Sequence, residues 1–125
     1  MTLTHVTALR STLADAVDAA INTGAGTATL KIRASTTDLI VFNLQNPAFG
    51  AASSGVITLA GVPISTTAAA TGTADNFQIL DRDGTLLVSG SVTATGGGGD
   101  IEATNTSIAT SQDADLTSLT YTAPT

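Results

Sequence analysis

The chain has 125 residues, of which 42% are hydrophobic and only 11% charged, and its formal net charge is −6. This length fits one domain, residues 1–125, and the hydrophobic content excludes intrinsic disorder as the main state. The acidity argues against nucleic acid or an anionic membrane surface as a partner, and no run approaches the roughly 18 apolar residues of a membrane span. No basic segment leads into an apolar stretch at the start, so we expect no signal peptide.

Residues 1–24 carry the one helical pattern in the sequence. Its apolar residues recur at spacings of three and four: Val6, Leu9, Leu13, Val17 and Ile21. Its polar residues fall mainly on the other side: Arg10, Ser11, Asp15 and Asp18. Thr4 or Thr7 can cap the start, and Asn22-Thr23-Gly24 supplies a stop. We expect the apolar stripe to lie on the chain's own sheet or on a neighbouring subunit.

From Gly26 onward the apolar pattern has a period of two, which is typical of strands. The expected strands are Ala28–Arg33, Asp38–Leu44, Val56–Ile64, Phe77–Leu80, Thr85–Val92, Ile101–Ile108 and Leu116–Tyr121. The run Asp38–Leu44 is apolar on both faces, so it should be central or covered on both sides. The stretches Ser65–Thr73 and Gly96–Gly99 are expected to be mobile loops without apolar anchors.

This succession of short strands indicates a mainly β fold, an antiparallel sandwich or barrel preceded by one helix. We expect an antiparallel β-sandwich or jelly-roll-like domain of about seven strands over residues 25–125, with the helix at 1–24. No internal repeat and no interdomain linker interrupt it, so a single domain is predicted.

The hairpin around Asp81–Gly84 carries the clearest local signal. Asp-Gly favours a type I′ turn, and the apolar residues on either side alternate, which predicts that they face the interior. These residues are Phe77, Ile79, Leu86 and Val88. Asp81, Asp83 and Gly84 also match the start of a calcium loop, but the third acid and the distal Glu are absent. A plain turn is the better interpretation, and a cation at Asp81 and Asp83 stays open.

No catalytic set is recognisable, so we predict neither an enzyme nor a cofactor or metal site. Cysteine is absent, and the single histidine, His5, has no neighbouring carboxylate to orient it. Gly96–Gly99 is not followed by the Lys-Ser/Thr of a phosphate loop. Nothing singles out Glu102 as a partner in a carboxylate pair, and Asp113 and Asp115 fit a solvated turn. The scarcity of aromatic residues weakens carbohydrate and nucleic-acid binding.

Four segments in the same order resemble a group of small proteins encoded in tailed-bacteriophage genomes, usually without assigned function. The segments are TALRSTLADAVDAAINTGAGTATLKI, NPAFGAASSGVITLAGVPI, FQILDRDGTLLVSGSV and DIEATNTSIATSQDADLTSLTYT. The resemblance covers nearly the whole chain. It departs from the group at Arg33-Ala34 and at Gln112-Asp113, where we expect local loop differences.

The resemblance implies a virion structural protein. The first hypothesis is a capsid decoration (cement) protein on the capsid exterior that binds the major capsid protein and copies of itself, with a trimer as the expected oligomer. The alternatives are a head–tail junction or tail subunit and, from another class, a glycan-binding β-sandwich. With 24 threonines and one lysine, the surface suits packing against other subunits. The candidate interface residues are Val6, Leu9, Leu13, Val17, Ile21, Gly96, Gly97, Gly98 and Gly99.

Overall fold

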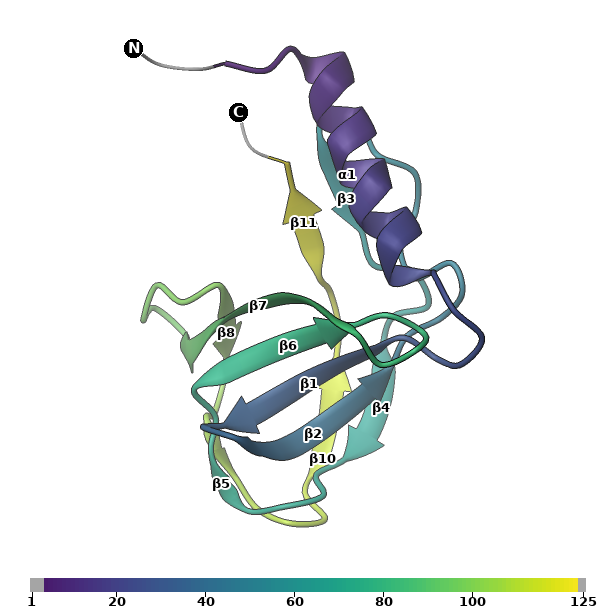
Figure 1. The fold of residues 1–125 in the computed structure, drawn as a ribbon. Helices are drawn as coiled ribbons and strands as arrows, with labels where there is room; N and C mark the ends of the chain where they lie inside the picture. The colour runs from purple at the N-terminus through teal and green to yellow at the C-terminus, as the bar shows by residue number, and fades with distance from the viewer. Residues whose placement is uncertain (1–3, 124–125) are drawn as a thin grey trace.

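The computed structural model describes residues 4–123, in which one helix precedes a β-rich body (Figure 1). The helix α1 spans Thr7–Ile21. The strands are β1 (Thr29–Ala34), β2 (Thr37–Asn43), β3 (Val56–Thr58), β4 (Ile64–Thr67), β5 (Gly72–Thr73), β6 (Asn76–Leu80), β7 (Leu86–Ala94), β8 (Ile101–Ala103), β9 (Ser107–Ile108), β10 (Asp113–Leu116) and β11 (Thr120–Thr122). The predicted mainly β fold with one N-terminal helix is confirmed.

The strands are more numerous than expected because three predicted strands are each divided in two and β5 forms where a loop was expected. The stretch 56–64 separates into β3 and β4 at Gly61, whose φ is +73°, and Pro63, which has no N–H to donate. Residues 101–108 hold β8 and β9, and the predicted strand 116–121 covers the end of β10 and the start of β11. The two halves of each predicted strand therefore pair with different partners.

The prediction of a loop at Ser65–Thr73 is wrong. The stretch contains most of β4 and all of β5, which pair with β10 and β9. Ala68 is buried, and the N–H of Ala69 donates to the carbonyl of Leu39 at 2.7 Å. Small side chains let this segment lie close against β2, so alanine supplies the apolar anchors that a search for larger residues misses.

Five strands form the main sheet in the order β2-β1-β6-β7-β8, and only the β7–β8 pair is parallel. Three two-stranded pairs surround it: β10–β4, β11–β3 and β5–β9. On β2, the consecutive residues Leu39 and Ile40 are both buried although they point to opposite faces. The prediction that this strand is covered on both sides is confirmed.

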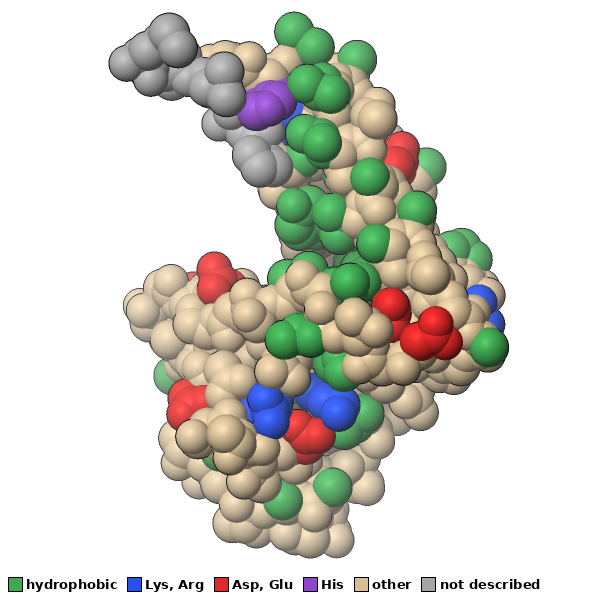
Figure 2. All heavy atoms as spheres, in the orientation of Figure 1, with side chains coloured by type: hydrophobic (Ala, Val, Ile, Leu, Met, Phe, Trp, Pro, Cys, Tyr) green, Lys and Arg blue, Asp and Glu red, His purple; other side chains and the backbone are tan. Residues whose placement is uncertain are grey.

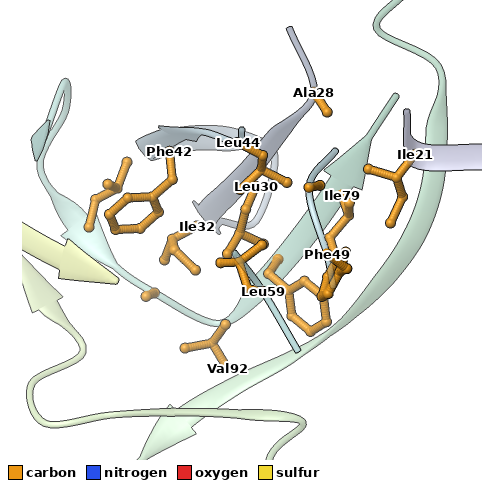
Figure 3. Close-up of a cluster of buried hydrophobic side chains, with 14 of the residues drawn as sticks. Ile21, Ala28, Leu30, Ile32, Phe42, Leu44, Phe49, Leu59, Ile79 and Val92 are labelled. Carbon is orange, nitrogen blue, oxygen red and sulfur yellow. The ribbon is translucent and has the colours of Figure 1, made fainter. Parts of the chain in front are cut away.

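The core lies between the main sheet and the segments that cross it. Figure 3 shows side chains from β1, β2 and β6 converging with Phe49, from the connection between β2 and β3, and with Leu59, which directly follows β3. Leu30 and Phe49 are among the largest fully buried side chains. Ile21, at the end of α1, points to the same cluster, so this end of the helix is fixed to the body.

The β6–β7 hairpin confirms two of its predicted core residues and contradicts one. Phe77 and Ile79 are each 6% exposed, whereas Leu86 is 48% exposed. The cause is a register shift, since Ile79 pairs with Val88 but Leu80 pairs with Leu86. The residue between them on β7 has no partner and breaks the alternation, which turns Leu86 to the surface.

The turn at Asp81–Gly84 is not of type I′, because Gly84 is its one residue with a positive φ, at +85°. One carboxylate oxygen of Asp81 accepts the N–H groups of Asp83 and Thr85, each at 2.9 Å. Asp81 is only 8% exposed. The buried carboxylate therefore organises the turn through backbone amides, which explains why an aspartate stands at its first position.

The four glycines between β7 and β8 let the chain turn back within a few residues and start a parallel strand. Gly96 and Gly98 have φ values of +88° and +80°. A Cβ on Gly97 or Gly99 would lie under 3.0 Å from the Thr93 side chain. Gly96 and Gly98 thus provide a positive φ, whereas Gly97 and Gly99 leave room for the Thr93 side chain. The mobility expected of this loop stays a prediction.

A pair of substitutions at Gly98 tests the backbone requirement, because a Cβ there meets no atom within 4 Å. We expect Gly98→Val to lower the free energy of unfolding by about 1–2 kcal/mol, since a β-branched residue resists positive φ. Gly98→Asn should cost clearly less, because Asn tolerates this conformation. Urea unfolding of both variants measures the difference, and equal costs would contradict the assignment.

Candidate interaction surface

The helix and two strands stand away from the main sheet as an arm, which we define as α1, β3 and β11 (Figure 1). β3 pairs with β11 and contacts α1, so the arm has its own internal support. Figure 2 shows a hollow between the arm and the body. The molecule therefore has the shape of a hook, with the start of α1 at its tip.

A row of four hydrogen bonds joins α1 and its C-cap residue Asn22 to residues 48–55. The bonds, donor first, are Ala48 N to Asn22 Oδ1 (2.8 Å), Phe49 N to Asp18 Oδ1 (3.1 Å), Ala52 N to Asp15 Oδ1 (2.9 Å) and Gly55 N to Ser11 Oγ (3.1 Å). The polar face of the helix, predicted to point away, thus faces the chain. These backbone N–H groups need acceptors, and the side chains provide them.

The predicted apolar stripe of α1 divides between the core and the surface. Ile21 is 1% exposed, and Leu13 and Val17 pack half-buried against the core. Leu9 is 44% exposed and Val6 is 70% exposed. One end of the stripe therefore lies on the chain's own body, and the other end is free at the tip of the arm.

The start of the helix differs from the prediction. Val6 is the N-cap residue and no side chain caps the first turn, so neither Thr4 nor Thr7 has the expected role. Arg10 reaches back across the arm, where its Nη2 donates to the carbonyl of Ala123 at 3.5 Å. Within residues 4–123, His5 Nδ1 and Arg10 Nε are buried atoms without a hydrogen-bond partner.

At the base of the arm lies a cleft of about 280 Å³, which we call the elbow cleft. Its lining residues are Phe49, Phe77, Ile79, Val88, Ser89, Asp100, Ile101, Leu119, Thr120, Tyr121 and Thr122. They come from β6 and β7 on one side and from β11 on the other, with Asp100 as the one charged group. Ser91 holds that carboxylate through its N–H at 3.0 Å and its hydroxyl at 3.2 Å.

A second cavity of about 400 Å³ lies between the main sheet and residues 101–118. Apolar side chains such as Ile32, Phe42 and Val92 line it together with Glu102, Asp113 and other polar residues. Neither the hydrogen bonds nor the charges around it single out a ligand.

The carboxylates considered as candidate sites in the sequence lie apart from one another. They accept hydrogen bonds from backbone N–H groups or from neighbouring side chains. Asp83 accepts the N–H of Ala25 at 3.3 Å, Glu102 accepts that of Gly96 at 2.8 Å, and Asp115 accepts the hydroxyl of Ser65 at 2.7 Å. In the described part of the chain no three His, Asp or Glu residues gather as a metal site. Over the same residues no helix is long and apolar enough to cross a membrane.

The structure does not join the two halves of the predicted interface into one surface. Val6 and Leu9 are at the tip of the arm, whereas Gly96–Gly99 connect β7 to β8 at the edge of the main sheet (Figure 1). The prediction missed the elbow cleft, because its walls come from strands far apart in the sequence. The polar row on α1 was detectable, since residues 11, 15, 18 and 22 recur at helical spacing.

One ion-pair cluster lies on the outer face of β1 and β2. Asp38 contacts Lys31 at 3.1 Å and Arg33 at 2.7 Å. Burial raises the pKa of Asp38, but the hydrogen bonds and charges of Lys31 and Arg33 outweigh it, so the pKa lies below its usual value. A lowered pKa in the folded state means that the ionised carboxylate stabilises the fold.

The lowered pKa predicts how stability depends on pH. The contribution of Asp38 is present above its unfolded pKa of about 3.9 and is lost as the pH falls through the lower folded pKa. The side chain is 36% exposed, so solvent screening limits the effect. We expect Asp38→Asn to cost up to about 1 kcal/mol at pH 7 in low salt. Urea unfolding should show this cost shrinking below pH 4, and a cost that is constant with pH would contradict the assignment.

Comparisons with protein-family models, with curated proteins and with solved structures found no match. The likeness to phage proteins thus rests on the four quoted segments.

Proposed function

We propose that this chain is a bacteriophage virion structural protein that decorates the outside of the capsid. It would bind the major capsid protein, contact copies of itself and stabilise the shell against the pressure of the packaged DNA. The observation that carries the proposal is the arm, whose tip exposes apolar side chains while its base is fixed to the body. The four-segment resemblance supplies the phage context.

The arm supports a role in assembly because its apolar side chains are exposed on a helix that is held in place. Four hydrogen bonds and the buried Ile21 hold α1 in place, yet Val6 and Leu9 face solvent. Neighbouring exposed apolar side chains on a fixed element are typical of surfaces that contact another protein. A virion subunit, which is surrounded by other subunits, offers such a contact.

The surface chemistry supports an outward position on the particle. The chain has four Lys and Arg residues against ten Asp and Glu residues, so it carries little that would attract DNA phosphates. Thr and Ser side chains lose less conformational entropy than Lys or Arg when a neighbouring subunit covers them. Both properties suit a protein that packs on the outer face of a shell.

Heat-triggered DNA release from purified particles tests the proposal. Particles assembled without this chain should release DNA at a lower temperature than complete particles, and added purified wild-type chain should restore the release temperature. Phe77→Ala, which weakens the core, should restore it poorly, whereas Ala19→Ser, an exposed change on α1, should restore it fully. An unchanged release temperature without the chain would refute the decoration role and favour the head–tail junction or tail alternative.

A further inference from the structure

We propose that the outer edge of β7 binds a β-strand from another protein, an extended segment that carries a basic residue. The edge, which we call the open edge, is the side of residues 86–91 that faces away from β6. It is separate from the exposed apolar residues of the arm. The inference therefore goes beyond the proposed function and does not depend on it.

The open edge has no strand beside it in the described chain. β7 pairs with β6 along residues 86–91, whereas β8 pairs only with residues 92–94 on the other side. The bulge lies before Val88, so residues 88–91 keep a regular register with β6. Val88 and Ser89 line the elbow cleft, so there is open space next to this part of the strand.

The hydrogen bonds of neighbouring residues show which backbone groups point to the open edge. The N–H of Val92 donates to the carbonyl of Asp75 at 3.0 Å, on the β6 side. The N–H of Ser91 donates to the carboxylate of Asp100 at 3.0 Å, on the β8 side. Successive residues of a strand alternate in this direction, so the N–H and C=O of Ser89 also point to the open edge. These are the groups with which an added strand forms hydrogen bonds.

The open edge lacks the features that keep sheet edges free of partners. Such edges usually carry charged residues or proline, or are covered by another segment. β7 contains no charged residue and no proline, and its Leu86 and Leu87 are 48% and 39% exposed. At the opposite end of the main sheet, by contrast, the carbonyl of Leu39 on β2 accepts the N–H of Ala69 at 2.7 Å. Apolar side chains beside free backbone groups favour strand addition.

The charges near the open edge favour a basic partner over a second copy of this chain. Asp100 is exposed and is the one charged residue that lines the elbow cleft. Both of its bonds from Ser91 go to Oδ2, which leaves Oδ1 for a cation. Pairing two copies edge to edge would bring together two Asp100 carboxylates and two chains of net charge −6. A segment with Lys or Arg would instead meet an opposite charge.

Binding of a labelled synthetic heptapeptide, Lys-Val-Thr-Val-Thr-Val-Lys, to the full chain tests the inference by fluorescence anisotropy. The wild type should bind this peptide. The same peptide methylated at every internal backbone nitrogen should bind about ten-fold more weakly or worse, because it cannot donate hydrogen bonds to the edge. Replacing both Lys residues by Glu should also weaken binding. Asp100→Asn, which keeps an acceptor for Ser91, should reduce the difference between the Lys and Glu peptides.

Two substitutions at Ser89 separate the backbone from the side chain. Ser89→Pro removes the N–H at the open edge, which β6 does not use, and should abolish peptide binding. Ser89→Ala keeps the N–H and should bind like the wild type. Far-ultraviolet circular dichroism shows whether each variant is folded. If the Pro variant does not fold, the methylated peptide with the wild type decides the question.

Hydrogen exchange resolved by NMR locates the contact. Bound peptide should slow exchange of the Ser89 amide, whereas the Gly90 amide, which points to β6, should change little. No binding of the Lys peptide, equal binding of its methylated form, or a Ser89 amide that exchanges equally fast with and without peptide would overturn the inference. Concentration-dependent protection of Ser89 without peptide would assign the edge to a second copy and overturn it too. No capsid is present, so these outcomes are independent of the DNA-release result.

Discussion

Phe77→Ala is expected to lower the free energy of unfolding by about 3–5 kcal/mol, a large share of the stability of a small domain. The ring is 6% exposed and lies in the centre of the main sheet, opposite Gly90 on β7. A Cβ on Gly90 would be 2.6 Å from the ring, so the aromatic side chain covers the glycine directly. Truncation removes this cover and enlarges the elbow cleft, which the Phe77 side chain lines.

Leu86→Ala is the matched control for this prediction. Leu86 belongs to the same hairpin, and simple alternation would place it in the interior with Phe77. The register shift turns it outward to 48% exposure, so we expect its truncation to cost less than about 1 kcal/mol. Urea unfolding of both variants at equal protein concentration measures the contrast, and similar losses would contradict the outward position of Leu86.

Asp18→Ala should loosen the arm, with a loss of about 1–3 kcal/mol. The carboxylate accepts the N–H of Phe49 at 3.1 Å and the side-chain amide of Asn22 at 2.9 Å. Its removal leaves a part-buried backbone donor without a partner. We expect faster hydrogen exchange in α1 and in residues 48–55. Exchange in the main sheet should be unchanged, because the four hydrogen bonds between the helix and residues 48–55 do not involve the main sheet.

Asp18→Asn separates the hydrogen bond from the charge. The amide keeps an oxygen at the same position, so it can still accept from Phe49 and should retain most of the protection against exchange. If the Ala and Asn variants exchange equally fast, the hydrogen bond does not hold the helix. If the main sheet exchanges faster together with α1, the arm is not a separate unit of stability.

Much of the fold could be predicted because local patterns and burial agree there. The alternation at 28–33 predicts β1, and the two-sided apolar run at 38–44 predicts a strand covered on both faces. The bulge that exposes Leu86 could not be predicted, because it depends on pairing between β6 and β7 and not on either strand alone. Most of β4 and all of β5 were missed because the Ala, Ser and Thr residues after Ile64 give no apolar alternation, although Ala68 is buried.

The candidate surface could be predicted only in part. Helical spacing identifies Val6, Leu9 and Ile21 as one stripe, but it cannot show that Ile21 is buried while Val6 is free. That difference depends on how far along α1 the rest of the chain covers the helix. The elbow cleft brings Val88 of β7 beside Tyr121 of β11, and no local pattern connects residues so far apart in the sequence.

The number of copies of this chain in purified virions tests the central claim most directly. A decoration protein covers the shell, so quantitative mass spectrometry against the major capsid protein should find hundreds of copies per particle. Antibody labelling should place them over the whole outer surface. Absence from the particle would contradict a structural role, and a single ring of copies at one vertex would assign the chain to the head–tail junction instead.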